Sequence, residues 1–174
     1  MSNSREIITT LRKTDALTRF TKIETNALEE FYRNQTETDK YRAFKEELKS
    51  KGSTIVQYII KNRLGWVDEN GLPALEPASV TLFTDPSDVL IITNDFPYNF
   101  GKPITHFVVW SKVIIESDPE SKIGDVSDHT KNIINTYVKR TFVDQLGLKP
   151  ENVNWFRNFP AIQSVRELSH IHIL

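Results

Sequence analysis

Two histidines near the end of the chain, His170 and His172, have the residue type and spacing best suited to chemistry. They stand two residues apart in a β-rich run, and the two-residue period of a strand points both side chains to one face. Ile171 and Ile173 then point to the other face, which we expect to be core. Paired imidazoles on a strand can titrate near neutral pH, attack phosphorus or ligate a metal. The alternative is that both histidines simply face solvent.

A proline-containing loop at residues 94–103 interrupts the β-rich part of the chain. Its two prolines and one glycine forbid a regular strand ladder there. Asn94 and Asp95 begin this loop directly after an apolar run, a common place for functional groups. Their side chains can equally well serve turn formation, so both interpretations stay open.

A third histidine, His106, follows the loop in an apolar run at residues 105–110. Counting by two, His106, Val108 and Trp110 share one face of the expected strand. A tryptophan on the histidine face either stacks on a base or sugar or packs in the core.

The elements that must position these residues follow from periodicity. In the first third, apolar spacing predicts helices over about 25–34 and 38–50, and Ser53 is expected to cap a further helix that ends near 64–66. The later part predicts β-type runs at 80–83, 89–93 and 105–110, the last extending to Ile115, a long helix at 127–146, and final strands at 153–156 and 168–173. The long helix has a predicted buried stripe of Ile134, Tyr137, Val138, Phe142 and Leu146, with Gly147 as its left-handed terminator.

Strand runs separated by one long helix predict an α+β domain with an antiparallel sheet. A chain of 174 residues is the size of one domain, so we expect a single domain over 1–174. Within it, residues 1–66 form an N-terminal helical cap and residues 78–174 form the α+β core.

Composition excludes several classes of protein. The net charge is −1 and cysteine is absent, which removes disulfide scaffolds, thiol nucleophiles and cysteine-ligated zinc. No apolar run reaches the length of a signal peptide or a membrane span, so we expect a cytoplasmic protein that binds neither membrane nor nucleic acid. Residues 1–64 nevertheless carry a net charge of +4, which leaves open an adaptor that works through this helical region.

The order of these motifs resembles the histidine-triad (HIT) superfamily of nucleotidyl hydrolases and transferases over about residues 80–174. An Asn-x-x-Pro loop at 94–97 is followed by His106, an apolar strand and Lys112, then by a helix, a strand and a terminal His-x-His. Thr105 stands where that family has glycine, and the last motif has two histidines rather than three.

The HIT resemblance implies a HIT-like antiparallel sheet and a nucleophile. His170 would attack the phosphorus of the substrate and form a phosphohistidine. His106 and His172 would stabilise charge on the phosphoryl oxygens, helped by a hydrogen bond from the Ser164 hydroxyl. His170 and His172 are therefore the expected catalytic pair.

The same resemblance implies the ligand. Lys112 or Arg157 would add positive charge, and Asn94 would meet a ribose or sugar hydroxyl. The expected substrate-binding residues are His106, Asn94, Asp95, Trp110, Lys112, Arg157 and Ser164. The ligand is a small phosphorylated molecule (a nucleotide, nucleotide sugar or sugar phosphate), and the reaction is that of a phosphohydrolase or nucleotidyl transferase. The resemblance also implies a homodimer.

Two alternatives stay open. One is a non-catalytic metabolite-binding or protein-interaction module on the same fold. The other is a zinc ion held by the three imidazoles with one open position. The expected form has no cofactor and no metal.

A second resemblance covers most of the chain. The segments Arg63-Leu64-Gly65-Trp66, Asn94 to Tyr98, His106 to Trp110 and His170-Ile171-His172 are similar to the fungal N-acetylglucosamine-induced protein family, a domain of unknown function. This resemblance implies a fungal intracellular protein connected to the amino-sugar response.

Overall fold

A four-stranded antiparallel sheet forms the centre of the computed structural model, which describes residues 33–100 and 104–174 together with Ile23, Leu28 and Phe31. The strands lie in the order β1-β2-β4-β3, with bounds β1 Val89–Thr93, β2 Phe107–Ser111, β4 Ser169–Ile173 and β3 Trp155–Phe156. The predicted α+β class is confirmed. The last strand β4 pairs directly with β2, the strand that follows the proline-containing loop.

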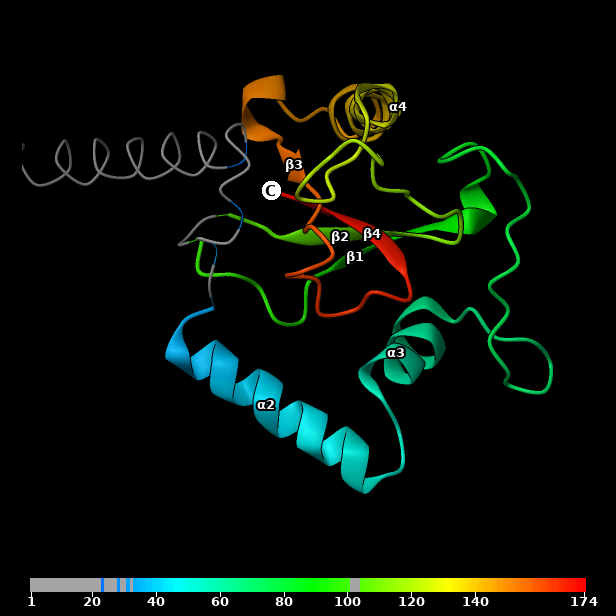
Figure 1. Ribbon diagram of the computed structural model, residues 1–174, viewed down its shortest axis with the longest axis vertical. Helices are drawn as coiled ribbons and strands as arrows, with labels where there is room; N and C mark the ends of the chain where they lie inside the picture. Colours follow the sequence, from blue (N-terminus) through cyan, green and yellow to red (C-terminus); the bar gives the residue numbers. More distant parts are fainter. Residues whose placement is uncertain (1–22, 24–27, 29–30, 32, 101–103) are drawn as a thin grey trace, which may run out of the picture.

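Helices cover both faces of this sheet (Figure 1). On one side lies α4, Asp128–Val138, which continues as a π-helical segment, Lys139–Gln145. On the other side lie α2, Gln35–Ser50, and α3, Ile55–Tyr58, which continues as a π-helical segment, Ile59–Leu64. Two short 3-10 helices, Pro86–Asp88 and Pro150–Asn152, precede β1 and β3.

The face toward α4 is a continuous apolar core because alternate strand residues point into it. Val109, Ile171 and Ile173 pack there against Ile134 and Phe142 of the helix. The predicted helix stripe is correct at four of its five positions. The fifth was wrong: Leu146 is 63% exposed, because the helix has changed its pitch by then and Gly147, at φ 70°, turns the chain away.

The opposite face is built differently. Val108 and Trp110 pack on Ile59, Ile60 and Leu64, which lie in the helical segment after α3. These contacts occupy only part of the face. The rest of the face carries histidine side chains. On this side of the sheet, polar imidazoles therefore lie next to the apolar side chains of the helical segment.

Local signals begin and end the helices on this side. The Asn34 side chain accepts the Glu37 N–H at the start of α2. The start of α3 differs from the prediction: Thr54, not Ser53, is the N-cap, because its hydroxyl accepts the Gln57 N–H while the Gln57 side chain accepts the Thr54 N–H. Gly65, at φ 63°, ends the helical segment where expected.

Two strand predictions were wrong and one helix prediction lies outside the described residues. Residues 80–83 form a turn, with Phe83 at φ 60° and Val80 95% exposed, because the turn buries Leu82 and Phe83 rather than alternating them. β2 ends at Ser111, whose hydroxyl donates to the Val113 carbonyl, so the strand does not reach Ile115. The helix expected over 25–34 falls mainly on residues that the structure does not describe.

Candidate functional site

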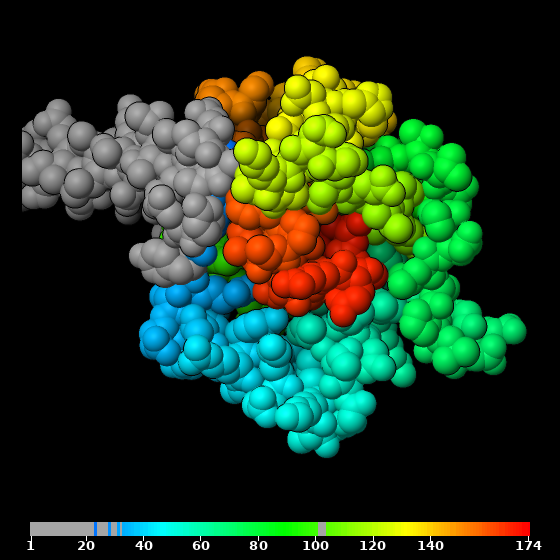
Figure 2. All heavy atoms as spheres, in the orientation of Figure 1, coloured from blue at the N-terminus to red at the C-terminus, as the bar shows by residue number. Residues whose placement is uncertain are grey.

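A cavity of about 80 Å³ lies between the sheet and the layer of α2 and α3. Figure 2 shows the atoms of this layer, in blue to cyan, lying against the red C-terminal strand. Side chains from α2, α3, β1, β2 and β4 and from two loops enclose the space. The lining residues are Arg33, Tyr41, Ile55, Tyr58, Ile59, Arg63, Ile92, Thr93, Asn94, Asp95, Phe96, Tyr98, Val108, Trp110, Asn158, Ser164, Val165, His170 and His172.

The register of the sheet places the histidines in this cavity. His170 lies opposite Trp110 and His172 opposite Val108 across the β2–β4 ladder. Cross-strand neighbours share a face, so both imidazoles join the face of Val108 and Trp110, while Ile171 enters the apolar core on the other side. The two-residue spacing therefore predicted correctly which way these side chains point.

His170 presents one free nitrogen. Its Nδ1 lies 2.8 Å from the Leu168 carbonyl oxygen, which can only accept, so Nδ1 carries the proton and Nε2 carries the lone pair. The ring lies 4.5 Å from the Trp110 ring, centroid to centroid. Burial lowers the pKa of His170 to about 4, the dominant cause being desolvation of the charged form. The imidazole is thus neutral and nucleophilic at pH 7.

His172 and His106 form a hydrogen-bonded pair. His106 Nε2 lies 2.9 Å from His172 Nδ1, and the second nitrogen of His172 lies 3.3 Å from Asn158 Nδ2. Asn94 Nδ2 lies 3.3 Å from His106 Nε2. Because an amide N–H donates, Asn158 assigns the proton of His172 to Nδ1, which then donates to His106. Both nitrogens of His172 therefore have partners within the protein.

Burial also determines the charge of this pair. Desolvation, with a smaller contribution from the nearby Arg33 charge, lowers the pKa of His106 to about 3. Desolvation is again the main cause for His172, whose pKa lies well below its ordinary value. All three imidazoles are consequently uncharged at neutral pH.

The three imidazoles are not arranged around a metal position. Two nitrogens that bind one tetrahedral zinc at about 2.0–2.1 Å lie about 3.3 Å apart, whereas His106 and His172 are hydrogen-bonded at 2.9 Å. Among the residues that the structure describes, no group of three or more His, Asp or Glu side chains is placed to hold a metal ion.

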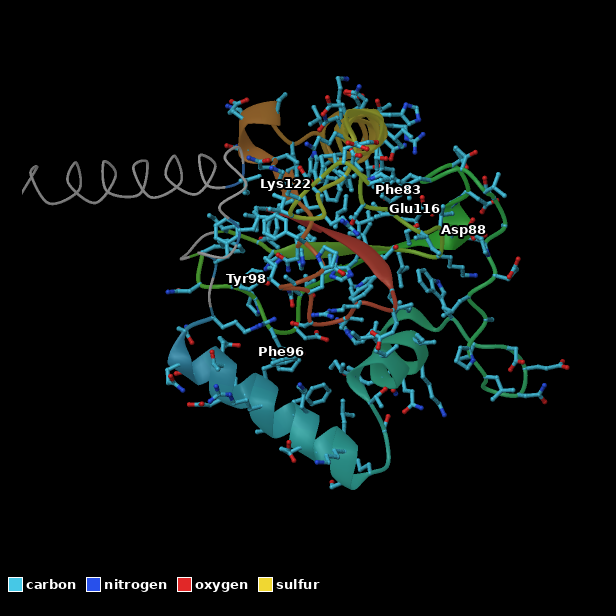
Figure 3. All side chains as sticks on the ribbon, viewed as in Figure 1. Phe83, Asp88, Phe96, Tyr98, Glu116 and Lys122 are labelled. Atoms are coloured by element: carbon cyan, nitrogen blue, oxygen red, sulfur yellow. The ribbon has the colours of Figure 1, made fainter. Side chains whose placement is uncertain are left out.

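Two arginines bring positive charge to the cavity wall. The Arg63 side chain is paired with Asp95, with Nε 2.8 Å from Oδ2. Arg33 is instead held by neutral groups: its Nε donates to the Phe96 carbonyl at 2.9 Å, and its guanidinium carbon lies 4.7 Å from the Tyr41 ring centroid. Phe96 itself projects toward α2 (Figure 3).

Three lining side chains each have a buried polar atom that makes no hydrogen bond within the described structure. Arg63 Nε has an ion-pair partner in Asp95, whereas the indole Nε1 of Trp110 and the amide Oδ1 of Asn158 have no partner there. Leaving such an atom unpaired costs about 1–3 kcal/mol. Native proteins keep few such atoms, which makes this part of the molecule a candidate for function rather than ordinary packing.

Most of the predicted site residues come together here. His170, His172, Asn94, Asp95, Trp110 and Ser164 line the cavity, and His106 lies behind it in contact with His172. Two do not. The Lys112 ammonium lies 5.6 Å from the Trp66 ring, outside the lining. The Arg157 guanidinium donates to the carbonyls of Ile115 and Gly124 and so joins loops on another part of the surface.

Among the lining residues that sequence reasoning missed, Arg33, Tyr98 and Asn158 make polar contacts close to the histidines. Tyr98 belongs to the Asn94-to-Tyr98 motif, which was the available signal for it. Asn158 precedes Phe159-Pro160 much as Asn94 precedes Phe96-Pro97, and this similarity between the two loops is the sequence signal for Asn158. No spacing in the sequence marks Arg33, because Tyr98 and the Phe96 carbonyl that hold its side chain come from a distant loop.

Comparison with known proteins gives the relatives of this chain. A family model described as a protein of unknown function, DUF3605, matches residues 18–174. N-acetylglucosamine-induced protein 1 of Candida albicans is 36% identical in an alignment of 163 residues that covers 87% of this chain and 64% of that protein. The chain thus spans less than two thirds of the Candida relative.

Two further proteins are similar. An uncharacterized protein of Saccharomyces cerevisiae is 33% identical over 153 residues, covering 87% of this chain and 73% of its own length. The crystal structure of HTC1 superposes with a TM-score of 0.67 at 29% identity, covering 88% of this chain and 79% of that one.

Proposed function

The chain belongs to the DUF3605 family of proteins of unknown function, and we infer its chemistry from the geometry of the site. We propose that the cavity binds a small phosphorylated ligand and that His170 accepts the phosphoryl or nucleotidyl group of that ligand. The observation that carries this proposal is the lone pair on His170 Nε2. It belongs to a neutral imidazole that lines the cavity and whose other nitrogen is fixed by the Leu168 carbonyl.

In the proposed reaction, His170 first takes the phosphoryl group and then passes it to water. The Nε2 lone pair of His170 forms a bond to phosphorus while the bond from phosphorus to the leaving oxygen breaks, and that oxygen keeps the electron pair and takes a proton from solvent. Positive charge develops on the imidazole, and the Leu168 carbonyl stabilises it through the Nδ1–H. Water then attacks phosphorus, its proton passes to solvent, and the nitrogen–phosphorus electron pair returns to Nε2.

The roles of the other two histidines differ from those that the HIT resemblance implies. His172 has both nitrogens engaged, one by His106 and one by Asn158. In this proposal the pair supports the wall of the cavity beside His170 and touches the ligand only after those hydrogen bonds exchange. The HIT-like interpretation of the fold and the nucleotide class of ligand remain parts of the proposal.

The ligand classes in the proposal are nucleotides, nucleotide sugars and sugar phosphates. The name of the Candida relative connects that protein to N-acetylglucosamine. We propose that this chain acts in an amino-sugar response in the cytoplasm, with such phosphorylated compounds as its candidate ligands.

One experiment tests the nucleophile. The wild-type protein and His170→Asn are incubated with a panel of nucleotides, nucleotide sugars and sugar phosphates, and intact mass spectrometry detects a covalent phosphoryl or nucleotidyl adduct. The asparagine can still donate an amide N–H to Leu168 but offers no nucleophilic nitrogen, so its adduct is expected to be absent. His129→Asn, at an exposed histidine on α4, is the matched control and is expected to form the adduct as wild type does.

A second candidate function is binding without turnover, and the engaged nitrogens of His172 favour it. In that case a ligand raises the melting temperature of the wild type, yet no adduct and no product form. An adduct in His170→Asn at the wild-type level would show that another residue is the nucleophile. A panel that leaves the melting temperature unchanged and yields no product would overturn both candidates.

A further inference from the structure

The Arg33 side chain is held in one orientation by contacts that do not neutralise its positive charge. Its Nε donates to the Phe96 carbonyl at 2.9 Å, which leaves four guanidinium N–H groups. The guanidinium carbon lies 4.7 Å from the Tyr41 centroid and 5.1 Å from the Tyr98 centroid. A planar cation fixed on two aromatic rings loses little further freedom when it binds an anion.

Within the described part of the chain, no carboxylate neutralises this cation. Among the residues that the structure describes, no Asp or Glu forms an ion pair with Arg33, whereas Arg63 on the same cavity is paired with Asp95 at 2.8 Å. An arginine that has no counter-charge among the described residues and lies in a partly enclosed cavity is suited to an anionic ligand. The planar fork of guanidinium donors matches two oxygens of a phosphoryl group.

The charge of Arg33 lies on the histidine side of the cavity. It contributes to the lowered pKa of both His106 and His172, which places its field at the imidazole pair. Arg33 and His170 line the same cavity, with His172 beside His170 on β4. An anion bound to Arg33 would therefore lie in the cavity that His170 also lines.

We propose that Arg33 is the anchor for the phosphoryl group of the ligand, pairing two of its oxygens with the guanidinium fork and holding phosphorus near His170. The inference rests on the proposed function and adds the residue that selects a phosphorylated ligand. It replaces Lys112 and Arg157, which the sequence suggested for this role and which lie outside the cavity.

The test uses ligands small enough for the cavity. Inorganic phosphate and glycerol 3-phosphate are titrated calorimetrically into the wild type, Arg33→Gln, Arg33→Lys and Arg42→Gln. Arg42 is exposed on α2 and serves as a control for the loss of one positive charge. Arg33→Gln is expected to weaken binding of both ligands at least tenfold, and Arg33→Lys to weaken it nearly as much, because lysine keeps the charge but lacks the planar fork. Arg42→Gln should stay within threefold of wild type.

The outcomes separate this inference from the proposed function. Full affinity in a folded Arg33→Gln protein would overturn the anchor while leaving His170 as the proposed nucleophile. Full affinity in Arg33→Lys would overturn the two-oxygen geometry, and equal losses in Arg33→Gln and Arg42→Gln would show only a long-range charge effect. No binding of either ligand or of any compound of the panel to the wild type would defeat the proposed function itself. The melting temperature of each unliganded variant confirms that it is folded.

Discussion

Three uncharged histidines inside the protein are the feature of single residues with the widest consequences. Their neutrality follows from burial: each is only 5% exposed, and removing an imidazolium from water is costly. A neutral imidazole keeps a lone pair at physiological pH, which is the state that a nucleophile needs. The same burial links the stability of the fold to pH.

This linkage predicts that the protein loses stability as the pH falls below about 6.5. An unfolded chain protonates its histidines near pH 6.5, whereas in the folded protein the pKa is about 3 for His106, about 4 for His170 and well lowered for His172. Below pH 6.5 the unfolded state therefore binds more protons, and acid favours it. From pH 6.5 to 5.5 each histidine costs about 1 kcal/mol, so the free energy of unfolding should fall by about 3 kcal/mol.

Urea titrations at pH 6.5 and 5.5 measure this loss. In His170→Asn the loss should shrink by about a third, because one of the three groups no longer titrates. A free energy of unfolding that is constant between these pH values would mean that the imidazoles are not buried in neutral form.

At the level of the elements, the start of α3 decides how the helical layer meets the sheet. Thr54 and Gln57 exchange side-chain and backbone hydrogen bonds, which fixes where the chain turns into the helix. From that point Ile59, Ile60 and Leu64 fall on Val108 and Trp110. A cap displaced by one residue would rotate this apolar stripe by about 100° away from the cavity.

Thr54→Ala is expected to lower the free energy of unfolding by about 1 kcal/mol, the usual value of a lost N-cap. Ser53→Ala is the matched control and should change it by less than about 0.5 kcal/mol, since Ser53 is only partly buried and does not cap the helix. Chemical unfolding of both variants distinguishes the two residues. A larger loss in Ser53→Ala would show that the helix starts one residue earlier.

For the whole molecule, the sheet separates two regions of different character. The face toward α4 is apolar and closely packed, with Val109, Ile134 and Ile171 completely buried. The face toward α2 and α3 holds the cavity, the imidazoles and the unpaired atoms of Trp110 and Asn158. Ligand binding is therefore expected to stabilise one side of the sheet locally, while the other side serves as a rigid support.

Hydrogen exchange should show this asymmetry. With a ligand from the phosphorylated panel at about 100 times its Kd, the protein gains about 2.7 kcal/mol against global unfolding. Local exchange of the amides in α3 and in the 94–98 loop should slow, because both line the cavity. Amides of α4 exchange by local opening on the far face and are the internal control. Slowing confined to α4 would place the ligand on the wrong side of the sheet.

Periodicity and local chemistry in the sequence were enough to determine much of this protein. Alternation at residues 170–173 predicted which strand face carries histidine, and glycines at 65 and 147 predicted where two helical segments end. These signals succeed because they depend on neighbours a few residues apart. They failed at residues 80–83, where the β-type residues pack into the core from a turn, and at Ser53, where Thr54 offered a better cap.

Only the tertiary structure decided the composition of the site. Arg33 meets Tyr98, and Asn158 meets His172, across separations in the chain that no local pattern encodes. Lys112 and Arg157 were plausible cations by order along the chain, yet the fold directs them to Trp66 and to carbonyls of other loops. Sequence order constrains the strand faces, because covalent geometry alternates side chains, but the neighbours across a cavity are selected by the packing of whole elements.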